Sequence, residues 1–380
     1  MLRLFDEWMQ SGGLVAAPEF PSHAAATRAI DRIPGDEESR LALGRVAEAI
    51  TMLHEPDAQP VLPRVYALGA LLEQRGRFAE AADVYTSVCR FVDVRAHFDL
   101  AFDAFMRQGF CLRNMGEFEQ ASRAYSTAGM HAGRMRDRVR VLESRIGEAK
   151  VQWGRGDLPG ADASMLKIAS EAVALGAPAA KVVVATKHDR AGIARNRGDL
   201  KQAVRLAFEA FQQSTTDYAR ERVLGDLGNF LGLTGAFDTA RAALTLLVAT
   251  ANQQETKWIA EQNLMDLAIR EGSEPRFVQH RRALEKAKLP TKTRLTFMRD
   301  VGKGLVAFGH LDEAEAPLRS ALELAARIGA HQTEFELEGM LADLSATRRA
   351  LEASRPARSE APPDIASEIE NLLASVGVAV

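Results

Sequence analysis

The sequence predicts an all-α protein, built as a right-handed superhelical α-solenoid of helical hairpins with helical caps. Alanine, leucine and arginine are plentiful, aromatic residues make up only 6% of the chain, and runs of β-branched residues are scarce, which favours helix over sheet. A short motif that begins with glycine also recurs at nearly constant spacing. With 380 residues and 47% hydrophobic side chains, the chain is long enough to bury a large core.

Residues 1–60 are predicted to form an N-terminal helical cap with loops. Within them, residues 36–54 (DEESRLALGRVAEAITMLH) have the pattern of a helix between proline-containing segments. Stacked hairpins need atypical end units with a polar outer face. Asp6 and Glu7 interrupt the apolar core that a secretory signal would need, and no apolar run of 18 residues occurs. We therefore expect a cytoplasmic protein without a membrane partner.

Residues 61–330 are predicted to form the repeat array. In six clear copies of the motif, a large apolar residue follows the glycine by two positions and alanine follows it by five. A seventh, degenerate copy at Gly272 makes the steps between successive glycines 40, 40, 42, 37, 37 and 37 residues. A sustained period in this range is typical of a repeat array. The six clear copies begin at Gly76, Gly116, Gly156, Gly198, Gly235 and Gly309.

Each position of the motif has a physical reason. Glycine ends the first helix in the left-handed conformation, which costs other residues about 1–2 kcal/mol. The alanine, and a small residue seven positions before the glycine, let the two helices of a hairpin pack closely. The copy at Gly272 has Met265 and Phe277 where small residues belong, so its register stays open. Pro317 falls inside a predicted second helix, where proline can introduce a kink.

The tripeptide Arg-Gly-Asp occurs twice, at residues 155–157 and 197–199. Such tripeptides can mark cell adhesion, but both copies coincide with the glycine of the repeat motif. The aspartate then stands near the start of the next helix, where a negative charge suits the helix dipole. We interpret both tripeptides as structural turns.

This pattern resembles the tetratricopeptide repeat (TPR) family, whose signature is a small residue, glycine seven positions on, alanine five further on and then an aromatic residue. The resemblance covers residues 62 to about 330. The usual period of the family is about 34 residues. The helices here should each be about half a turn longer, as in extended-helix TPR-like domains of bacterial regulators. The resemblance implies that the first helix of each hairpin lines a concave surface that binds partners.

The chain is predicted to end in three segments: a C-terminal capping helix at 331–353, a linker at 354–363 and an amphipathic helix at 364–380. The last has one apolar stripe behind a predicted N-cap at Asp364. Two alternatives stay open for it. It could pack as a final cap or dimer contact, or it could occupy the groove of the array until a partner displaces it. The stripe consists of Ile365, Ile369, Leu372, Leu373 and Val376.

Given the resemblance, residues ten, six and three positions before each turn glycine share the exposed face of a first helix. In the early repeats these positions include Tyr66, Met106, Arg113, Ile146 and Lys150. Asn229 matches an asparagine with which many TPR proteins hold the backbone of a ligand. Our candidate partner-binding residues are Phe110, Trp153, His188, Arg195, Arg222, Asn229, Gln262, Asp266, Arg299 and Lys303.

Charge is distributed unevenly near the end of the array. Segment 276–303 has nine lysines and arginines against two acids, and residues 308–380 have thirteen acids against six bases. Either Arg299 and Lys303 capture an acidic peptide or a C-terminal carboxylate, or the two segments balance each other or stay solvated. The net charge of −3 gives no reason to expect nucleic acid as a partner.

No motif for catalysis is present. The glycines around Lys303 lack the Walker spacing, and neither the scattered histidines nor Cys89 and Cys111 have the spacing of metal ligands. We expect no enzyme, no cofactor and no metal. The main hypothesis is a scaffold or adaptor that binds a peptide or helix of another protein in the concave groove. The alternative is a peptide-sensing bacterial regulator that changes its superhelical shape, and a homodimer also stays open.

Overall fold

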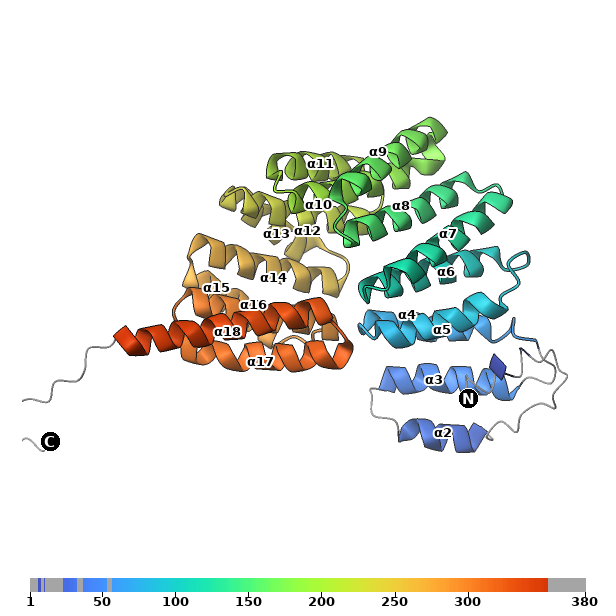
Figure 1. Cartoon of the computed structure of the whole chain (residues 1–380), viewed down its shortest axis with the longest axis horizontal. Helices are drawn as coiled ribbons and strands as arrows, with labels where there is room; N and C mark the ends of the chain where they lie inside the picture. Colours follow the sequence, from blue (N-terminus) through green and yellow to red (C-terminus); the bar gives the residue numbers. More distant parts are fainter. Residues whose placement is uncertain (1–5, 8–9, 11–22, 33–36, 53–56, 355–380) are drawn as a thin grey trace, which may run out of the picture.

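The computed structural model describes residues 6–7, 10, 23–32, 37–52 and 57–354. Every regular element within these ranges is a helix. The helices stack as hairpins into a right-handed superhelical solenoid (Figure 1). The fold class predicted from the sequence is confirmed.

Two helices precede the array. The sequence analysis predicted α3 (Glu37–Thr51) but not α2 (His23–Asp31). The segment that forms α2, HAAATRAID, is only nine residues long and its apolar positions are mostly alanine, so its helical pattern is hard to recognise in the sequence. It packs against α3, which supplies the apolar partner that its own sequence does not reveal.

Seven hairpins follow within residues 57–354, and a single last helix, α18 (His331–Ser354), comes after them. A 3-10 turn, η1 (Ala177–Ala179), precedes α10, and α17 runs through Pro317 without a break. The linker and amphipathic helix predicted beyond α18 lie outside the described residues, apart from Ser354. The hairpins are α4 (Leu62–Gln74) with α5 (Phe78–Phe91), α6 (Phe98–Asn114) with α7 (Phe118–Arg134), α8 (Arg138–Gly154) with α9 (Leu158–Leu175), α10 (Ala180–Asn196) with α11 (Leu200–Gln213), α12 (Asp217–Leu233) with α13 (Phe237–Thr250), α14 (Gln254–Glu271) with α15 (Glu274–Glu285), and α16 (Thr291–Ala307) with α17 (Leu311–Ile328).

The two Arg-Gly-Asp tripeptides are turns inside hairpins. Gly156 and Gly198 have φ angles of 86° and 80°, the left-handed conformation that glycine adopts without strain. The carboxylate of Asp157 then accepts a hydrogen bond of 2.9 Å from the backbone N–H of Gly160, and Asp199 caps the next helix in the same way. The interpretation of both tripeptides as structural turns is confirmed.

Small residues on the first helices make room for large side chains from the second helices. A Cβ atom added to Gly109 would lie 2.8 Å from the ring of Tyr125, and one added to Gly228 would lie 2.7 Å from the side chain of Leu244. Both distances are too short for a real carbon atom. The two helices of a hairpin are therefore packed more closely than any residue larger than glycine would permit at these positions.

The degenerate repeat keeps the same register. Gly272 ends α14 in the left-handed conformation, with a φ of 69°, as the other turn glycines do. Met265 and Phe277 are both fully buried, although small residues stand at these positions in the other copies. The space for Phe277 comes from Gly304 in the next hairpin, where an added Cβ would lie 2.2 Å from the ring. In this repeat, the small residue that the packing requires thus lies in the neighbouring hairpin.

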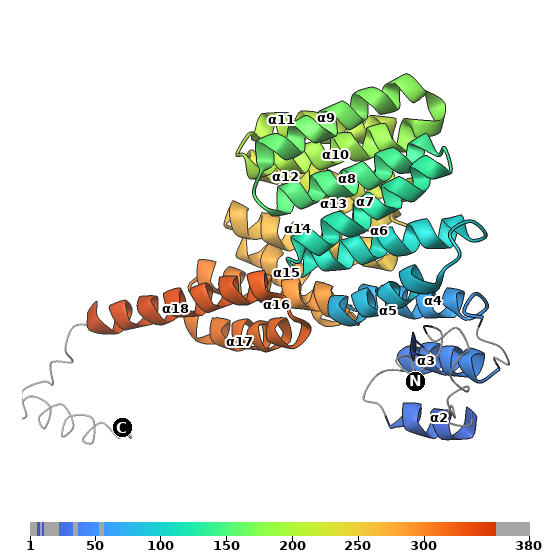
Figure 2. The ribbon, with the colours of Figure 1, turned by 45° about the vertical axis from the view of Figure 1, so that its right-hand side comes forward.

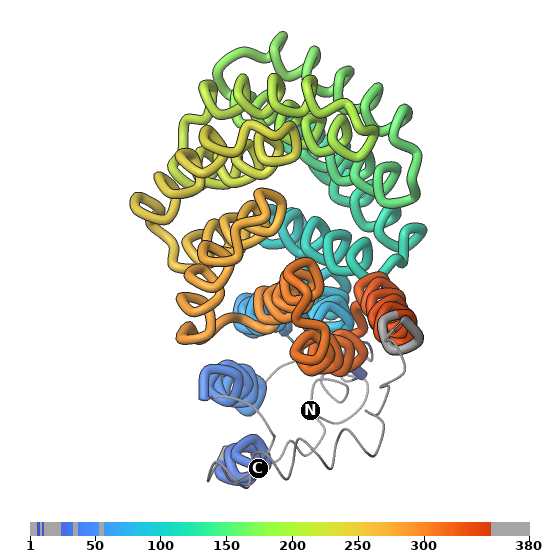
Figure 3. The backbone as a smooth tube through the Cα atoms, turned by 90° about the vertical axis from the view of Figure 1, so that its left-hand side faces the viewer, coloured from blue at the N-terminus to red at the C-terminus, as the bar shows by residue number. Residues whose placement is uncertain are grey.

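The array curves until its two ends meet. Figures 1 and 2 show α16 and α17 beside α4 and α5, and the tube in Figure 3 forms an almost closed ring. The ammonium group of Lys292, at the start of α16, lies 5.6 Å from the centroid of the Phe78 ring at the start of α5. The two ends of the solenoid therefore lie side by side, and we call the inside of this curve the hollow.

The contact between Phe277 and Gly304 yields a test. Gly304→Ala should lower the free energy of unfolding by about 1–3 kcal/mol, because the added methyl group overlaps the ring of Phe277. Gly133→Ala, in α7, is the control, since no atom lies within 4 Å of its added Cβ, and it should be neutral or stabilising by up to about 1 kcal/mol. Urea unfolding followed by circular dichroism measures both changes, and equal effects would contradict the close approach.

Candidate functional site

The first helices of the hairpins lie on the inside of the curve. Successive first helices contact one another directly, as in the pairs α4–α6, α6–α8, α8–α10, α12–α14 and α14–α16. Successive second helices have no comparable contact in the described part of the chain. In a curved stack the elements on the inside are the closer ones, so the first helices line the hollow, as the TPR resemblance implied.

Ion pairs, and one hydrogen bond between a histidine and an aspartate, link the first helices along this inner face. Because each link is partly exposed to solvent, it contributes roughly 0–1 kcal/mol to stability. Its larger effect is that these charges already have partners before any ligand arrives. The pairs are Arg107 with Glu73 at 2.8 Å, Lys150 with Asp189 at 3.1 Å, His188 with Asp226 at 2.6 Å, Lys303 with Asp266 at 2.6 Å, and Arg299 with Glu336 at 3.7 Å.

No ion pair joins α12 to α14 in the described residues, and amide side chains lie there instead. Gln262 is 7% exposed, and its Nε2 donates a hydrogen bond of 3.0 Å to the backbone carbonyl of Thr293, which ties α14 to α16. Asn229 and Asn263 are half-buried, and their side-chain amides make no hydrogen bond to any residue that the structure describes. Each therefore presents one carbonyl acceptor and two N–H donors to the hollow.

These amides belong to a pocket of about 520 Å³, which we call the groove pocket. It is lined by α10, α12, α14, α16 and α18, so five helices from successive units contribute to it. Six of the ten candidate residues predicted from the sequence line it, namely Arg195, Asn229, Gln262, Asp266, Arg299 and Lys303.

Part of the groove pocket was not predicted from the sequence. Asn263 lies one position after a predicted residue, so a rule of fixed offsets from the turn glycine passes over it. Glu336 and Asp343 come from α18, which was expected only to cap the array. The offset rule could not reach α18, because it counts back from a turn glycine that directly follows a first helix, and the sequence has no glycine directly after Ser354.

The groove pocket has no net charge. Four cations, from Arg195, Arg270, Arg299 and Lys303, stand against four carboxylates, from Asp266, Asp300, Glu336 and Asp343. Arg299 also lies 2.9 Å from Asp300. The two cations that the sequence suggested for capture of an acidic partner, Arg299 and Lys303, are thus both paired within the protein.

Two aspartates of the groove pocket titrate differently. Burial would raise the pKa of Asp266, but the hydrogen bonds and charges of Lys303 and Arg270 outweigh it and hold that pKa below its usual value. Burial raises the pKa of Asp300, and the adjacent Arg299 only partly opposes the rise. Asp266 is therefore the more firmly ionised of the two.

The other candidates lie elsewhere. His188 and Arg222 line a smaller pocket of about 130 Å³ between α8, α10 and α12. Trp153 packs against α10, where a Cβ added to Gly192 would lie 2.5 Å from the indole ring. Phe110 meets Phe78 edge to face, with ring centroids 6.0 Å apart. Both aromatic residues are half-buried parts of the wall, and their predicted contact with a partner stays a prediction.

The described residues provide neither a metal site nor a membrane-spanning helix. They contain no group of three or more histidine, cysteine, aspartate or glutamate side chains arranged to hold a metal ion. None of their helices combines the length and apolar character needed to span a bilayer.

Comparison with known proteins supports the fold. No family model and no curated protein matches the sequence. Among solved structures, the chain resembles a Rap protein complexed with Competence and Sporulation Factor, at 12% identity and a TM-score of 0.50, over 91% of this chain and 96% of that one. It also resembles NprR in complex with its cognate peptide NprX, at 12% identity and a TM-score of 0.54, over 86% of this chain and 99% of that one.

A third similar structure is the Rap conjugation gene regulator of the plasmid pLS20 in complex with a peptide. It has 12% identity and a TM-score of 0.54, over 86% of this chain and 95% of that one. At such low identity the likeness shows a shared fold. The chain has the architecture of TPR-like helical repeat proteins, as the sequence motif indicated.

The depressed pKa of Asp266 gives a prediction with a defined pH window. Asp266→Asn should lower the melting temperature at pH 7, because Lys303 and Arg270 lose a charged partner. A carboxyl whose folded pKa lies below its unfolded value stabilises the protein at neutral pH, and this contribution disappears as the pH falls through the folded value. The difference between variant and wild type should therefore vanish only below about pH 4.

Asp238→Asn is the matched control, because that carboxylate is 98% exposed and belongs to a surface pair with Arg241. It should change the melting temperature little at any pH. Melting curves between pH 2 and 7 would contradict the assignment if Asp266→Asn kept a constant difference from wild type throughout.

Proposed function

We propose that the groove pocket binds a peptide or a helical segment of a partner protein and that the chain acts as a scaffold or adaptor. The observation that carries this proposal is the pair of amides, Asn229 and Asn263, that lack hydrogen-bond partners between internally paired charges. Around them, the remaining charged groups balance one another. Two charged residues of the pocket, Arg195 and Asp343, also have no ion pair in the described residues. The amides and these two groups can therefore contact a ligand without first breaking an ion pair.

The chemistry of an amide side chain suits a peptide backbone. An extended main chain presents alternating N–H and C=O groups, and one asparagine can accept from the first and donate to the second. Such contacts are independent of the ligand's side chains and so supply affinity for a main chain in general. The balanced lining favours a partner of balanced charge over the acidic one that segment 276–303 suggested.

The similar structures support a peptide as the ligand. Two Rap proteins and NprR share the fold, and each is described as a complex with a peptide or signalling factor. Because identity is only 12%, we take from them the class of ligand and no residue roles. We further propose that the chain acts by binding, without catalysis, and in the cytoplasm.

The alternative is a signal-responsive regulator whose superhelical shape changes when the peptide binds. The meeting of the two ends favours it, since a small rotation between each pair of hairpins accumulates along the array and becomes largest there. A ligand that prefers one curvature would shift the population toward that shape. Under this alternative, the peptide binds in the groove pocket, and the resulting change in structure is largest at the two ends of the array.

Binding in the groove pocket can be tested with a displayed library of random peptides. Peptides selected on the wild-type chain should lose at least about tenfold in affinity with Asn229→Ala plus Arg299→Glu, because two or more polar contacts are removed. The control is Gln202→Ala plus Arg205→Glu on the second helix α11, which should bind as wild type. Fluorescence anisotropy measures the affinities, and circular dichroism checks that each variant keeps its helical signal. Equal loss in both variants would contradict the assignment of the groove.

The two functional readings differ in solution dimensions. A regulator should change its radius of gyration when a selected peptide saturates it, whereas a static scaffold should not. Small-angle X-ray scattering with and without the peptide makes the comparison. The molecular mass from the same data tests the homodimer.

A further inference from the structure

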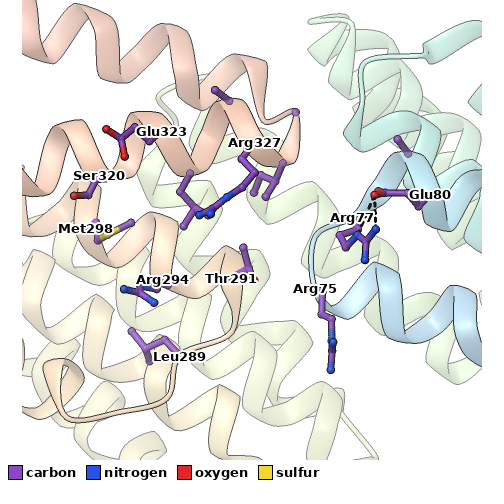
Figure 4. Close-up of a pocket in the computed structure, with 15 residues that line it drawn as sticks. Arg75, Arg77, Glu80, Leu289, Thr291, Arg294, Met298, Ser320, Glu323 and Arg327 are labelled. Atoms are coloured by element: carbon purple, nitrogen blue, oxygen red, sulfur yellow. Dashed lines mark hydrogen bonds and ion pairs between the residues drawn. The ribbon is translucent and has the colours of Figure 1, made fainter. Parts of the chain in front are cut away.

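A second, larger cavity lies where the two ends of the array meet. Its volume is about 1160 Å³, and we call it the closure cleft. One wall is the turn between α4 and α5, and the other is formed by the start of α16 and the end of α17 (Figure 4). More than 200 residues of chain separate the two walls, so the cleft exists only while the ring is closed.

Arginines dominate both walls. Arg75 and Arg77 come from the first wall, and Arg294 and Arg327 come from the second (Figure 4). Against these four cations stand two carboxylates, Glu80 and Glu323, which leaves a net charge of +2. This composition differs from that of the neutral groove pocket.

The arginines of the first wall form ion pairs, whereas those of the second wall do not. Arg77 lies 2.7 Å from Glu80, and Arg75 lies 3.0 Å from Glu38 of α3. Arg294 and Arg327 are exposed and have no ion pair or hydrogen bond with any side chain in the described residues. The second wall therefore holds the cations that are available to a ligand.

Like charges also meet beside the cleft. Lys292 lies beside the second wall, at the start of α16, and its exposed side chain is covered in part by the Phe78 ring 5.6 Å away. Its pKa is lowered first by the loss of solvent and then by the positive charge of Arg113, which Glu255 and Glu73 only partly offset. Within the first wall itself, burial and the neighbouring Arg77 lower the pKa of Arg75. The repulsion between the two ends is that of Lys292 and Arg113. Closing the ring thus brings cationic edges together at an electrostatic cost.

An anion bound between the two walls would attract the cations of both and so offset their mutual repulsion. Guanidinium groups form paired, charge-assisted hydrogen bonds with phosphate oxygens, and one phosphate can accept from more than one arginine. The cleft is larger than phosphates alone require, since pockets for drug-sized ligands measure about 300–1,000 Å³. The remaining lining includes the apolar side chains of Leu289, Met298, Leu324 and Ile328, which suit an uncharged body attached to the phosphates.

We propose that the closure cleft binds a small molecule with two or more phosphate groups on a partly apolar body, and that this ligand bridges the two ends of the array. The ligand places its phosphates against Arg294 and Arg327 of the second wall and against Arg77 of the first, whose Nη1 is not used by Glu80. Its body lies against the apolar part of the second wall. This inference does not depend on the proposed function, because the groove pocket and the closure cleft have no lining residue in common.

The test uses the full chain and three probes at physiological salt with EDTA: ATP, inorganic tripolyphosphate and adenosine. Titration calorimetry should show binding of ATP and of tripolyphosphate, with ATP the tighter ligand because it also has a body. Adenosine should not bind at millimolar concentration, since it lacks the phosphates. Failure of both phosphate compounds to bind, or equal binding of ATP and adenosine, overturns the proposal.

Variants then locate the site. Arg294→Gln plus Arg327→Gln should weaken ATP at least about tenfold, and Arg77→Gln should also weaken it, because the ligand contacts both walls. Arg205→Gln plus Arg282→Gln removes the same charge from exposed positions outside the cleft and should have no effect. Circular dichroism checks that each variant is folded.

Three outcomes overturn the assignment. If Arg205→Gln plus Arg282→Gln weakened ATP binding equally, ATP would be attracted to positive charge in general and not to the cleft. An unchanged affinity in Arg77→Gln would mean that the ligand does not bridge the walls. A loss of ATP binding in Asn229→Ala plus Arg299→Glu would place ATP in the groove pocket, whereas unchanged ATP binding in that variant keeps the two sites separate.

Discussion

The structure depends on the close approach of two helices at a residue without a side chain, where a large side chain from the facing helix fills the space. Tyr125 shows the principle most clearly. Its ring lies so near the backbone at Gly109 in its own hairpin, and at Gly147 in the next, that an added Cβ would lie 2.8 and 2.3 Å from it. One side chain thus fixes both the packing of a hairpin and the stacking of its neighbour. Because protein interiors are close-packed, such contacts leave little freedom in the angle between units.

That fixed angle produces the curvature, and the curvature produces the hollow. First helices approach one another on the inside, which brings charged side chains of successive units within reach. The resulting ion pairs leave few polar groups free along the inner face. The exception lies between α12 and α14, where Asn229 and Asn263 have no partner in the described residues, and it is there that the groove pocket opens. The site is therefore distinguished both by its own amides and by the ion pairs that occupy the charged side chains around it.

The same curvature brings together two ends that are remote in sequence. Lys292 reaches the ring of Phe78, and the arginines of both ends surround one cleft. A neutral pocket on the inner face and a cationic cleft at the ends are thus connected by every hairpin interface between them. Any ligand that alters the curvature at one site changes the separation of the walls at the other. In thermodynamic terms the two sites are linked if the open and closed shapes differ in affinity for either ligand.

The sequence by itself determined the local structure. The positions of the glycine and alanine predicted the hairpins, their turns at Gly156 and Gly198, and the face of each first helix, because these features follow from backbone conformation and a period of 3.6 residues. Six of the ten candidate residues consequently line one pocket.

Tertiary structure decided the rest. It determined that Arg299 and Lys303 are already paired, that α18 completes the groove pocket, and that Arg77 and Arg327 share a cleft. Periodicity within a helix cannot show which residues of different hairpins meet. That depends on small rotations summed over seven units of the described array, and a slight change in each would move the ends far apart.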